Sequence, residues 1–354
     1  MRGSNLNNGR FLDMNEFVYV SDSKVRKDLS SNLAKPGDLV FTQRGTLGQV
    51  AVIPDEGLSD SYVVSQSQMK LTVDGTKADR FFLYYYFSSR EAIERITNFV
   101  SSSGVPHINL TTLRSFEVPV PPLDIQKKIA AILSAYDDLI ENNRRRIQLL
   151  EQAAQLLYRE WFVRLRFPGH EHVRIKDGVP EGWEKKPLGD LLTLQRGFDL
   201  PANDREEGPY PIYASTGING FHKVAKVVGP GVVTGRSGSL GTVMYVPGDF
   251  WPLNTALWVK EFKRVSPLFA LHLLSGMKLE QYNGGAAVPT LNRNDVHRVE
   301  TLCPSRNIMR LFNDCINPLY LQIETLERSI KLLAQARDLL LPRLMNGDFG
   351  YEQR

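Results

Sequence analysis

The 354-residue chain has only two cysteines, Cys303 and Cys315, and no apolar run long enough to cross a membrane. The cysteine spacing fits neither a disulfide framework nor a metal site, which is typical of a reducing compartment. No charged segment followed by an apolar leader is visible. We therefore expect a cytoplasmic protein without a signal peptide and without a membrane partner.

Catalytic motifs are also missing. The glycine-rich run Gly235–Gly241 is not followed by the lysine of a phosphate loop, and the β-type run Thr242–Val246 after it indicates a hairpin turn. No Asn/Asp-Pro-Pro-aromatic segment of an amino-methyltransferase is present, and His170 and His172 have no further metal ligand nearby. Glu184–Lys186 fits a nuclease site only loosely. We expect a non-catalytic chain that holds no metal or cofactor of its own.

Charge and composition leave the class of protein open. There are 43 Lys and Arg against 39 Asp and Glu, and 42% of the residues are hydrophobic. This balance is ordinary for a folded protein, and it allows local basic patches without requiring them. The length is sufficient for two or three domains with their own cores.

The clearest positive feature is an internal repeat. Residues Leu139–Leu157 match Gln322–Leu340 without a gap, with identities such as Ile140/Ile323, Arg145/Arg328 and Leu150/Leu333. The parts outside this stretch echo each other as well: Arg44–Val50 resembles Ser237–Val243, Gly104–Leu110 resembles Ala287–Asn292, and Ser4–Gly9 resembles Ser215–Gly220. A chain with two like halves presents two like surfaces, which suit a two-part target or two copies of one partner.

Both copies of the repeated stretch predict a long helix with a heptad seam. The first helix is expected from Asp124, as its cap, to Glu160, or roughly 55 Å at 1.5 Å per residue. The second begins after Ser305 and is ended by Pro342 and Asn346-Gly347. Two such seams in one chain most simply pack on each other, and antiparallel pairing is possible. The seam residues that we expect to pair the helices or to dock partners are Ile140, Ile147, Leu150, Leu157, Trp161, Ile323, Leu326, Ile330, Leu333 and Leu340. Arg337 interrupts the second seam where the first has Ala154.

The remaining segments alternate short β-type runs with Gly and Asn turns. One helical run, Phe81–Ile96, carries aromatic residues that we expect in a core. The fold class is therefore α+β, with two β-rich globular domains and two long helices packed as an antiparallel coiled coil in a pseudo-two-fold repeat. We expect domains at residues 1–120 and 170–303 and long helices within 121–169 and 304–354.

The two globular domains differ at their openings. The second begins with Pro180–Asp190, about 35 residues before Ser215, whereas the first has only three residues before Ser4. We expect the first domain to be N-terminally incomplete, either because the sequence is incomplete or because its start is misassigned. A native truncation is the alternative.

Polar residues on the glycine-rich turns are candidates for contact with nucleic acid, because Arg suits guanine edges and Asn or Gln suit adenine edges. Ordinary turn polarity is the competing explanation for these residues. Arg144–Arg146 in the first long helix could contact an acidic partner or the DNA backbone, and a solvated helix face is the competing explanation there. The candidates are Arg2, Ser4, Asn5, Asn7, Gln43, Arg44, Gln66 and Gln68 in the first domain, and Ser215, Asn219, His222, Lys223, Arg236, Ser237, Asn254 and Thr255 in the second.

Four segments together give a resemblance that covers essentially the whole chain, twice over: Lys35–Gly48, Val118–Gln126, Pro180–Asp190 and Leu340–Gly347. With them the chain resembles the specificity subunit of type I restriction-modification systems. The resemblance implies that each globular domain is a target recognition domain that reads one half of a bipartite sequence in double-stranded DNA. It also implies that the paired helices act as a ruler for the gap between the half-sites.

The resemblance further implies partners. Two modification (methyltransferase) subunits would dock on the helices, and restriction/translocase subunits would complete the complex. S-adenosylmethionine, ATP and Mg²⁺ would be bound by these partners and not by this chain. A coiled-coil scaffold that joins two protein-binding domains remains the alternative, and it predicts no salt-dependent DNA affinity.

Overall fold

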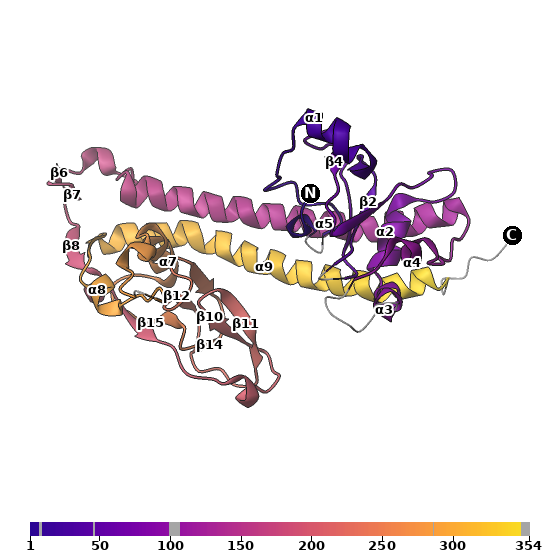
Figure 1. The fold of residues 1–354 in the computed structure, drawn as a ribbon. Helices are drawn as coiled ribbons and strands as arrows, with labels where there is room; N and C mark the ends of the chain where they lie inside the picture. The colour runs from indigo at the N-terminus through magenta and orange to yellow at the C-terminus, as the bar shows by residue number, and fades with distance from the viewer. Residues whose placement is uncertain (7–8, 45–46, 99–106, 286, 348–354) are drawn as a thin grey trace. The chain divides into compact units, whose positions relative to one another are not determined.

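The computed structural model describes residues 1–6, 9–44, 47–98, 107–285 and 287–347. The chain divides into two compact units (Figure 1). Unit 1 combines Met1–Arg144 with Arg328–Arg354, and unit 2 is Arg145–Glu327. Each unit contains a globular part together with one portion of each long helix. Within the described residues, no helix is long and apolar enough to span a membrane.

Unit 1 is built around a three-stranded antiparallel sheet in the order β3-β2-β5. Its strands are β2 (Leu39–Thr42), β3 (Val50–Val52) and β5 (Gln68–Leu71), and a second pair joins β1 (Leu33–Ala34) to β4 (Tyr62–Val63). Helical turns cover Gly3–Asn5 and Asp22–Asn32, and the helices are α2 (Arg80–Ser88), α3 (Arg90–Asn98) and α4 (Leu110–Arg114).

The expected aromatic helix consists of two helices, α2 and α3, that are separated at Ser89. Asp79 caps α2, since its Oδ1 accepts hydrogen bonds from the backbone N–H groups of Phe81 and Phe82. The prediction that its aromatics form a core is confirmed: Phe82 and residues 84–87 are buried, and the ring of Phe87 lies 4.9 Å from that of Phe41. This core joins α2 to the sheet.

Unit 2 has a four-stranded antiparallel sheet in the order β13-β12-β15-β9 and a three-stranded sheet in the order β11-β10-β14. The strands are β9 (Leu192–Arg196), β10 (Tyr210–Ala214), β11 (Gly217–His222), β12 (Gly231–Gly235), β13 (Val243–Val246), β14 (Trp251–Pro252) and β15 (Ala256–Phe262). Two further pairs join β6 (Ile175–Lys176) to β7 (Val179–Pro180) and β8 (Glu184–Pro187) to β16 (Glu300–Cys303). The helices are α6 (Leu188–Leu191), α7 (Pro267–Gly276) and α8 (Arg293–His297), with 3₁₀ turns at His170–His172, Ala202–Asp204 and Leu279–Tyr282.

Aromatic residues join α7 to the long helices in unit 2. The Phe162 ring meets those of Phe269 and Phe312 edge-on, each with centroids 4.9 Å apart. His272 lies in the same core, stacked on Tyr158, and its Nε2 is 3.3 Å from the hydroxyl of Tyr320. Burial lowers the pKa of His272 to about 4, so the imidazole is neutral at pH 7.

The long helices are α5 (Leu123–Tyr158), continued by a π-helical turn at Arg159–Val163, and α9 (Arg306–Met345). The prediction that Asp124 caps the first helix is wrong, because α5 already begins at Leu123 and Asp124 lies in its first turn. The prediction that Pro342 ends the second helix is also wrong. Pro342 lies inside α9, where its carbonyl still accepts a hydrogen bond from the N–H of Asn346, and Gly347 follows with φ of +74°.

The seams of α5 and α9 face each other in both units. In unit 1, Ile129 and Leu133 of α5 share a core with Leu341 and Leu344 of α9. In unit 2, later residues of α5, such as Ala154, pack with earlier residues of α9, among them Phe312, Ile316 and Ile323. The two helices therefore pair in antiparallel orientation, as expected, and every expected pairing residue is buried or half-buried.

The interruption of the seam by Arg337 has a local cause. Its guanidinium forms an ion pair of 2.5 Å with Asp137 of α5, and the hydroxyl of Tyr85 of α2 donates to the same carboxylate at 2.6 Å. The Asp137 side chain is only 11% exposed. Burial and this hydrogen bond raise the pKa of Tyr85, so that it remains a donor at neutral pH. The ion pair thus ties both long helices to the globular part of unit 1.

We predict that Arg337→Ala destabilises the folded chain by about 3 kcal/mol, because it leaves the buried Asp137 carboxylate without its cation. Denaturant unfolding followed by circular dichroism measures the change. Arg90→Ala serves as the control, since Arg90 is 92% exposed in its pair with Glu94 and such pairs contribute less than about 1 kcal/mol. Equal effects of the two substitutions would contradict the importance of the buried pair.

Candidate nucleic-acid interface

The same turn follows the inner strand β2 of unit 1 and the inner strand β12 of unit 2. After β2, the N–H of Gln43 donates to the carbonyl of Ser67 at 2.7 Å, and the carbonyl of Gln43 accepts from Ile108 at 3.1 Å. After β12, the N–H of Arg236 donates to Thr255 at 2.9 Å, and its carbonyl accepts from Leu291 at 2.8 Å. Gln43 and Arg236 are therefore structurally equivalent residues.

The next residue in each turn continues the equivalence. Arg44 forms an isolated bridge with His107, and Ser237 forms one with Thr290. This agrees with the sequence match of Arg44–Val50 to Ser237–Val243. The expected hairpin at Gly235–Gly241 is confirmed, because β12 and β13 on either side of it are antiparallel partners. Both units therefore hold one backbone arrangement and place different side chains on it.

In unit 2 a polar network gathers at one end of the four-stranded sheet. Asp199 accepts from Nη2 of Arg196 at 3.0 and 3.2 Å and from the amide of Asn254, while Nη1 of Arg236 donates to the Asn254 carbonyl at 3.2 Å. The Asn254 amide and Arg196 hold the pKa of Asp199 below its usual value. Two guanidinium groups for one carboxylate leave a net positive charge, which suits a phosphate or a base edge.

The predicted residues of unit 2 fall into two groups. Arg236, Ser237, Asn254 and Thr255 meet at this end of the sheet, and Ser215 lies beside the turn, since a Cβ on Gly235 would be 3.4 Å from the Ser215 Cβ. The second group lies on or next to β11 and has internal partners: Asn219 accepts from Arg205, His222 is buried against Trp251, and Lys223 pairs with Glu206 at 2.6 Å.

The predicted residues of unit 1 also differ in their surroundings. Asn5 and Gln68 are buried, which we did not expect of residues that contact a ligand. The Asn5 amide donates to the carbonyls of Asp13 and Asn15, and the Gln68 amide donates to that of Arg2, so both side chains order the surrounding loops. Gln43 is half-buried, Asn7 lies outside the described residues, and the exposed candidates are Arg2, Ser4, Arg44 and Gln66.

Sequence reasoning missed Arg196 and Asp199, which complete the network of unit 2. A usable signal was Gly197 between them. A Cβ there would lie 2.1 Å from the carbonyl oxygen of Leu253, so only glycine allows this close approach of β9 to the loop before β15. The glycine by itself indicates only that some other segment approaches the strand closely here, and not which segment does so.

Among the described residues, no group of three or more His, Cys, Asp or Glu side chains is arranged to hold a metal ion. What the interface offers is hydrogen-bonding side chains on turns that a sheet holds rigidly. This arrangement suits the recognition of a polar surface.

Comparison with known proteins agrees with a recognition role. The family model described as "Type I restriction modification DNA specificity domain" matches residues 6–152 and again residues 180–331. The chain thus belongs to the class of DNA sequence-recognition proteins, which are not themselves enzymes. Because the two matches cover most of the chain, this protein belongs to the type I restriction-modification specificity family.

Two relatives align along nearly the whole chain. The type I restriction enzyme MjaIX specificity subunit of Methanocaldococcus jannaschii is 26% identical, over 96% of this chain and 85% of its own. The HindI specificity subunit of Haemophilus influenzae is 24% identical, over 97% and 93%. The crystal structure of the S subunit from M. genitalium shares the fold, with a TM-score of 0.56, 18% identity, and coverage of 88% of this chain and 83% of the other.

We predict that Gly235→Ala disturbs the turn of unit 2, because the added Cβ would lie 1.8 Å from the carbonyl oxygen of Ser239. A loss of about 1–3 kcal/mol in the free energy of unfolding is expected. Gly248→Ala is the matched control in the same unit, since a Cβ there meets nothing within 4 Å. Thermal unfolding compares the two variants. An unchanged Gly235→Ala protein would show that the turn tolerates displacement.

Proposed function

We propose that this chain is the specificity subunit of a type I restriction-modification complex and reads a bipartite sequence in double-stranded DNA. Each unit reads one half-site. In this proposal the recognition domains are residues 1–120 and 170–303, and the long helices lie within 121–169 and 304–354, as the sequence suggested. The complex acts in the cytoplasm.

The observation that carries this proposal is the turn that both units share. The same backbone hydrogen bonds place Gln43 and Arg44 in unit 1 where unit 2 has Arg236 and Ser237. A single scaffold with two different sets of side chains is what a reader of two different half-sites requires, because base edges differ in their donors and acceptors. The network of Arg196, Asp199 and Asn254 holds Arg236 at the end of the sheet.

The long helices support the docking of two copies of one partner. The seam is covered, but Leu149 and Leu156 of α5 are 56% and 57% exposed, and Leu332 and Leu339 of α9 are 59% and 70% exposed. Each pair lies seven residues apart on one helix face, and the repeat aligns the two pairs with each other. Each unit thus presents one equivalent leucine pair to solvent, which suits one modification subunit per unit.

The partners supply the chemistry in this proposal. The modification subunits bind S-adenosylmethionine, and restriction/translocase subunits bring ATP and Mg²⁺. The antiparallel helices act as the ruler between half-sites. The 36 residues of α5 correspond to ~54 Å, which exceeds the ~34 Å of one DNA turn.

We predict that Arg236→Ala changes one half of the methylated motif and leaves the other half intact, whereas Arg44→Ala changes only the opposite half. Each loss of a base contact corresponds to about 1–3 kcal/mol of discrimination. Methylome sequencing of cells that express the chain with its cognate modification subunit measures both halves at once.

Arg264→Ala is the control for this experiment, since Arg264 is exposed in unit 2 and pairs with Glu184 away from the turn. It should leave the motif unchanged. A variant that alters both halves together would contradict the assignment of one half-site to each unit. A complex without any bipartite motif would refute the proposed function.

We predict that Leu149→Glu and Leu332→Glu each remove one modification subunit from the complex, and that the double variant removes both, because a carboxylate cannot be buried at an apolar contact without cost. Native mass spectrometry gives the stoichiometry. Gln155→Glu introduces the same charge at an exposed position of α5, about 100° around the helix from Leu156, and should leave the stoichiometry unchanged. Full occupancy of the double variant would place the docking surface elsewhere.

A further inference from the structure

The loop of residues 13–21 in unit 1 carries the most exposed large hydrophobic side chain among the described residues. Tyr19 is 84% exposed, and its neighbours Val18 and Val20 are 50% and 38% exposed. Three consecutive apolar side chains in solvent lose the stabilisation that burial would give, and such a patch marks a contact surface. None of the three belongs to the turn at Gln43 or to the exposed leucine pairs.

The buried side chain of Asn5 holds the base of this loop. Its amide donates to the carbonyls of Asp13 and Asn15 at 3.0 and 2.9 Å, and its backbone carbonyl accepts from the N–H of Asp13 at 2.8 Å. The ring of Phe17 packs on that of Tyr62, with centroids 5.7 Å apart. The three exposed residues follow Phe17 directly, so these contacts set where they are presented.

Hydrogen bonds also connect the base of the loop to the turn at Gln43. The side-chain oxygen of Asn5 accepts from the N–H of Arg2 at 2.8 Å, and the carbonyl of Arg2 accepts from the amide of the buried Gln68 side chain at 2.9 Å. Ser67, the neighbour of Gln68, accepts from the N–H of Gln43. The loop is therefore fixed beside the candidate nucleic-acid interface of its own unit.

Exposed cations follow the apolar tip of the loop in the chain. Lys24, Arg26 and Lys27 are exposed, and they outnumber the carboxylates of Asp22 and Asp28 in the same helical turns. Phosphates line both sides of each groove of a duplex, so an apolar tip with cations beside it suits a DNA groove.

Unit 2 exposes an apolar side chain at the matching place of the repeat. Val228 is 81% exposed. It lies between Ser215–Gly220 and β12, as Tyr19 lies between the matching Ser4–Gly9 and the equivalent strand β2. Both halves of the chain therefore present an apolar tip from the same stretch.

The tip of unit 2 is also fixed beside its polar network. Val227, its neighbour, forms an isolated bridge with Phe250. Nζ of Lys226 lies 5.4 Å from the ring centroid of Phe198, which precedes Asp199 of the network in the chain. Each unit thus has one apolar tip next to the residues that we expect to contact DNA.

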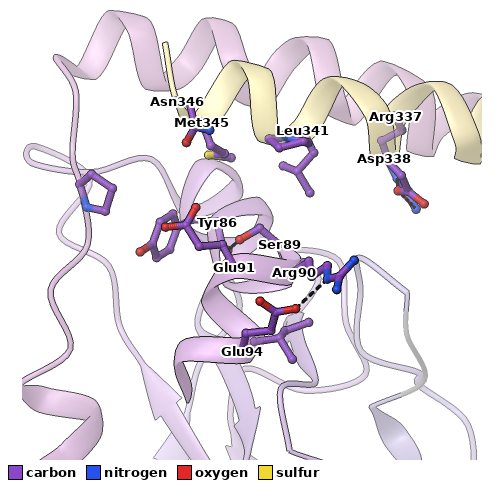
Figure 2. Close-up of a pocket in the computed structure, with 14 residues that line it drawn as sticks. Tyr86, Ser89, Arg90, Glu91, Glu94, Arg337, Asp338, Leu341, Met345 and Asn346 are labelled. Atoms are coloured by element: carbon purple, nitrogen blue, oxygen red, sulfur yellow. Dashed lines mark hydrogen bonds and ion pairs between the residues drawn. The ribbon is translucent and has the colours of Figure 1, made fainter. Parts of the chain in front are cut away.

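The groove of unit 1 does not take up the tip of that unit. A groove of about 920 Å³ lies between α2, α3 and the last turns of α9, and Figure 2 shows Tyr86, Leu341 and Met345 around it. No residue of the loop 13–21 lines this groove. The ring of Tyr19 is therefore left to solvent in the free chain.

We propose that Tyr19 inserts its ring into a groove of the DNA at the edge of the half-site of unit 1, and that Val228 makes the smaller equivalent contact in unit 2. The ring packs against a base step and partly unstacks it, as apolar side chains can do in a DNA groove. This inference rests on the proposed function, because DNA is the ligand. It adds a contact that senses how easily a step deforms to the base-edge contacts of Gln43 and Arg44.

The test uses the full chain in complex with its cognate modification subunit and a fluorescent duplex that carries the methylated motif. Tyr19→Ser should weaken binding about tenfold in fluorescence anisotropy, whereas Tyr19→Phe should bind like the unchanged chain because it keeps the ring. The salt dependence of binding should stay the same, since no charge is removed. Val120→Ser is the matched control, because Val120 is 51% exposed near the start of α5 in the same unit.

A fluorescent adenine analogue, aminopurine, locates the contact, because its emission rises when the base is unstacked. Duplexes carry it at single positions in and beside the half-site that Arg44→Ala changes, outside the methylated bases. The unchanged chain should raise the emission at one step, and Tyr19→Ser should abolish this rise. Unchanged affinity or unchanged emission with Tyr19→Ser would overturn the proposal, while an intact bipartite methylome would leave the proposed function standing. Loss of a modification subunit from the Tyr19→Ser complex in native mass spectrometry would assign the tip to a protein contact and would also overturn it.

Discussion

The apolar seam between α5 and α9 is the constraint on which the structure of both units depends. Among the described residues, neither globular part has a long helix of its own, and each core includes residues from both long helices. Most of the stability of a helix in a protein comes from packing of its apolar face, so α5 with 36 residues and α9 with 40 stabilise each other by burying their apolar stripes. The globular parts are then built against this shared support.

The contact between the globular part and the long helices is made by different residues in the two units, through α2 in unit 1 and through α7 in unit 2. In unit 1, Tyr85 donates to the Asp137 carboxylate, which pairs with Arg337. In unit 2, neutral His272 faces the hydroxyl of Tyr320. The aligned repeat places Tyr320 against Asp137 and Ala154 against Arg337, so a charged pair in one unit is replaced by a large and a small residue in the other. Each solution satisfies its buried polar atoms, which is the condition for keeping them there.

The equivalent turns at Gln43 and Arg236 also combine one backbone arrangement with two different sets of side chains. Backbone hydrogen bonds hold Gln43 and Arg236 in equivalent places, and these bonds do not depend on the side chains. Side chains there are free to differ without loss of the turn, whereas Gly235 and Gly197 are not, because other chain segments approach them within 2.1 Å of where a Cβ would be. The side chains that the turns present can therefore vary while the residues that the fold of the turn requires stay the same.

The sequence by itself determined the repeat, the heptad seams, the aromatic core of α2 and the hairpin at Gly235–Gly241, because these depend on periodicity and on local turn chemistry. It did not determine the exact helix ends. Pro342 removes only one backbone hydrogen bond near the end of α9, and tertiary packing stabilises the helix beyond this residue. Residue type also could not separate the exposed Arg44 from the buried Gln68, because both are polar residues near the end of a strand. Only the tertiary structure decided which of them face solvent and that Asp199 joins Asn254 from 55 residues away. Those features arise from contacts between segments distant in sequence, and no local pattern encodes such contacts.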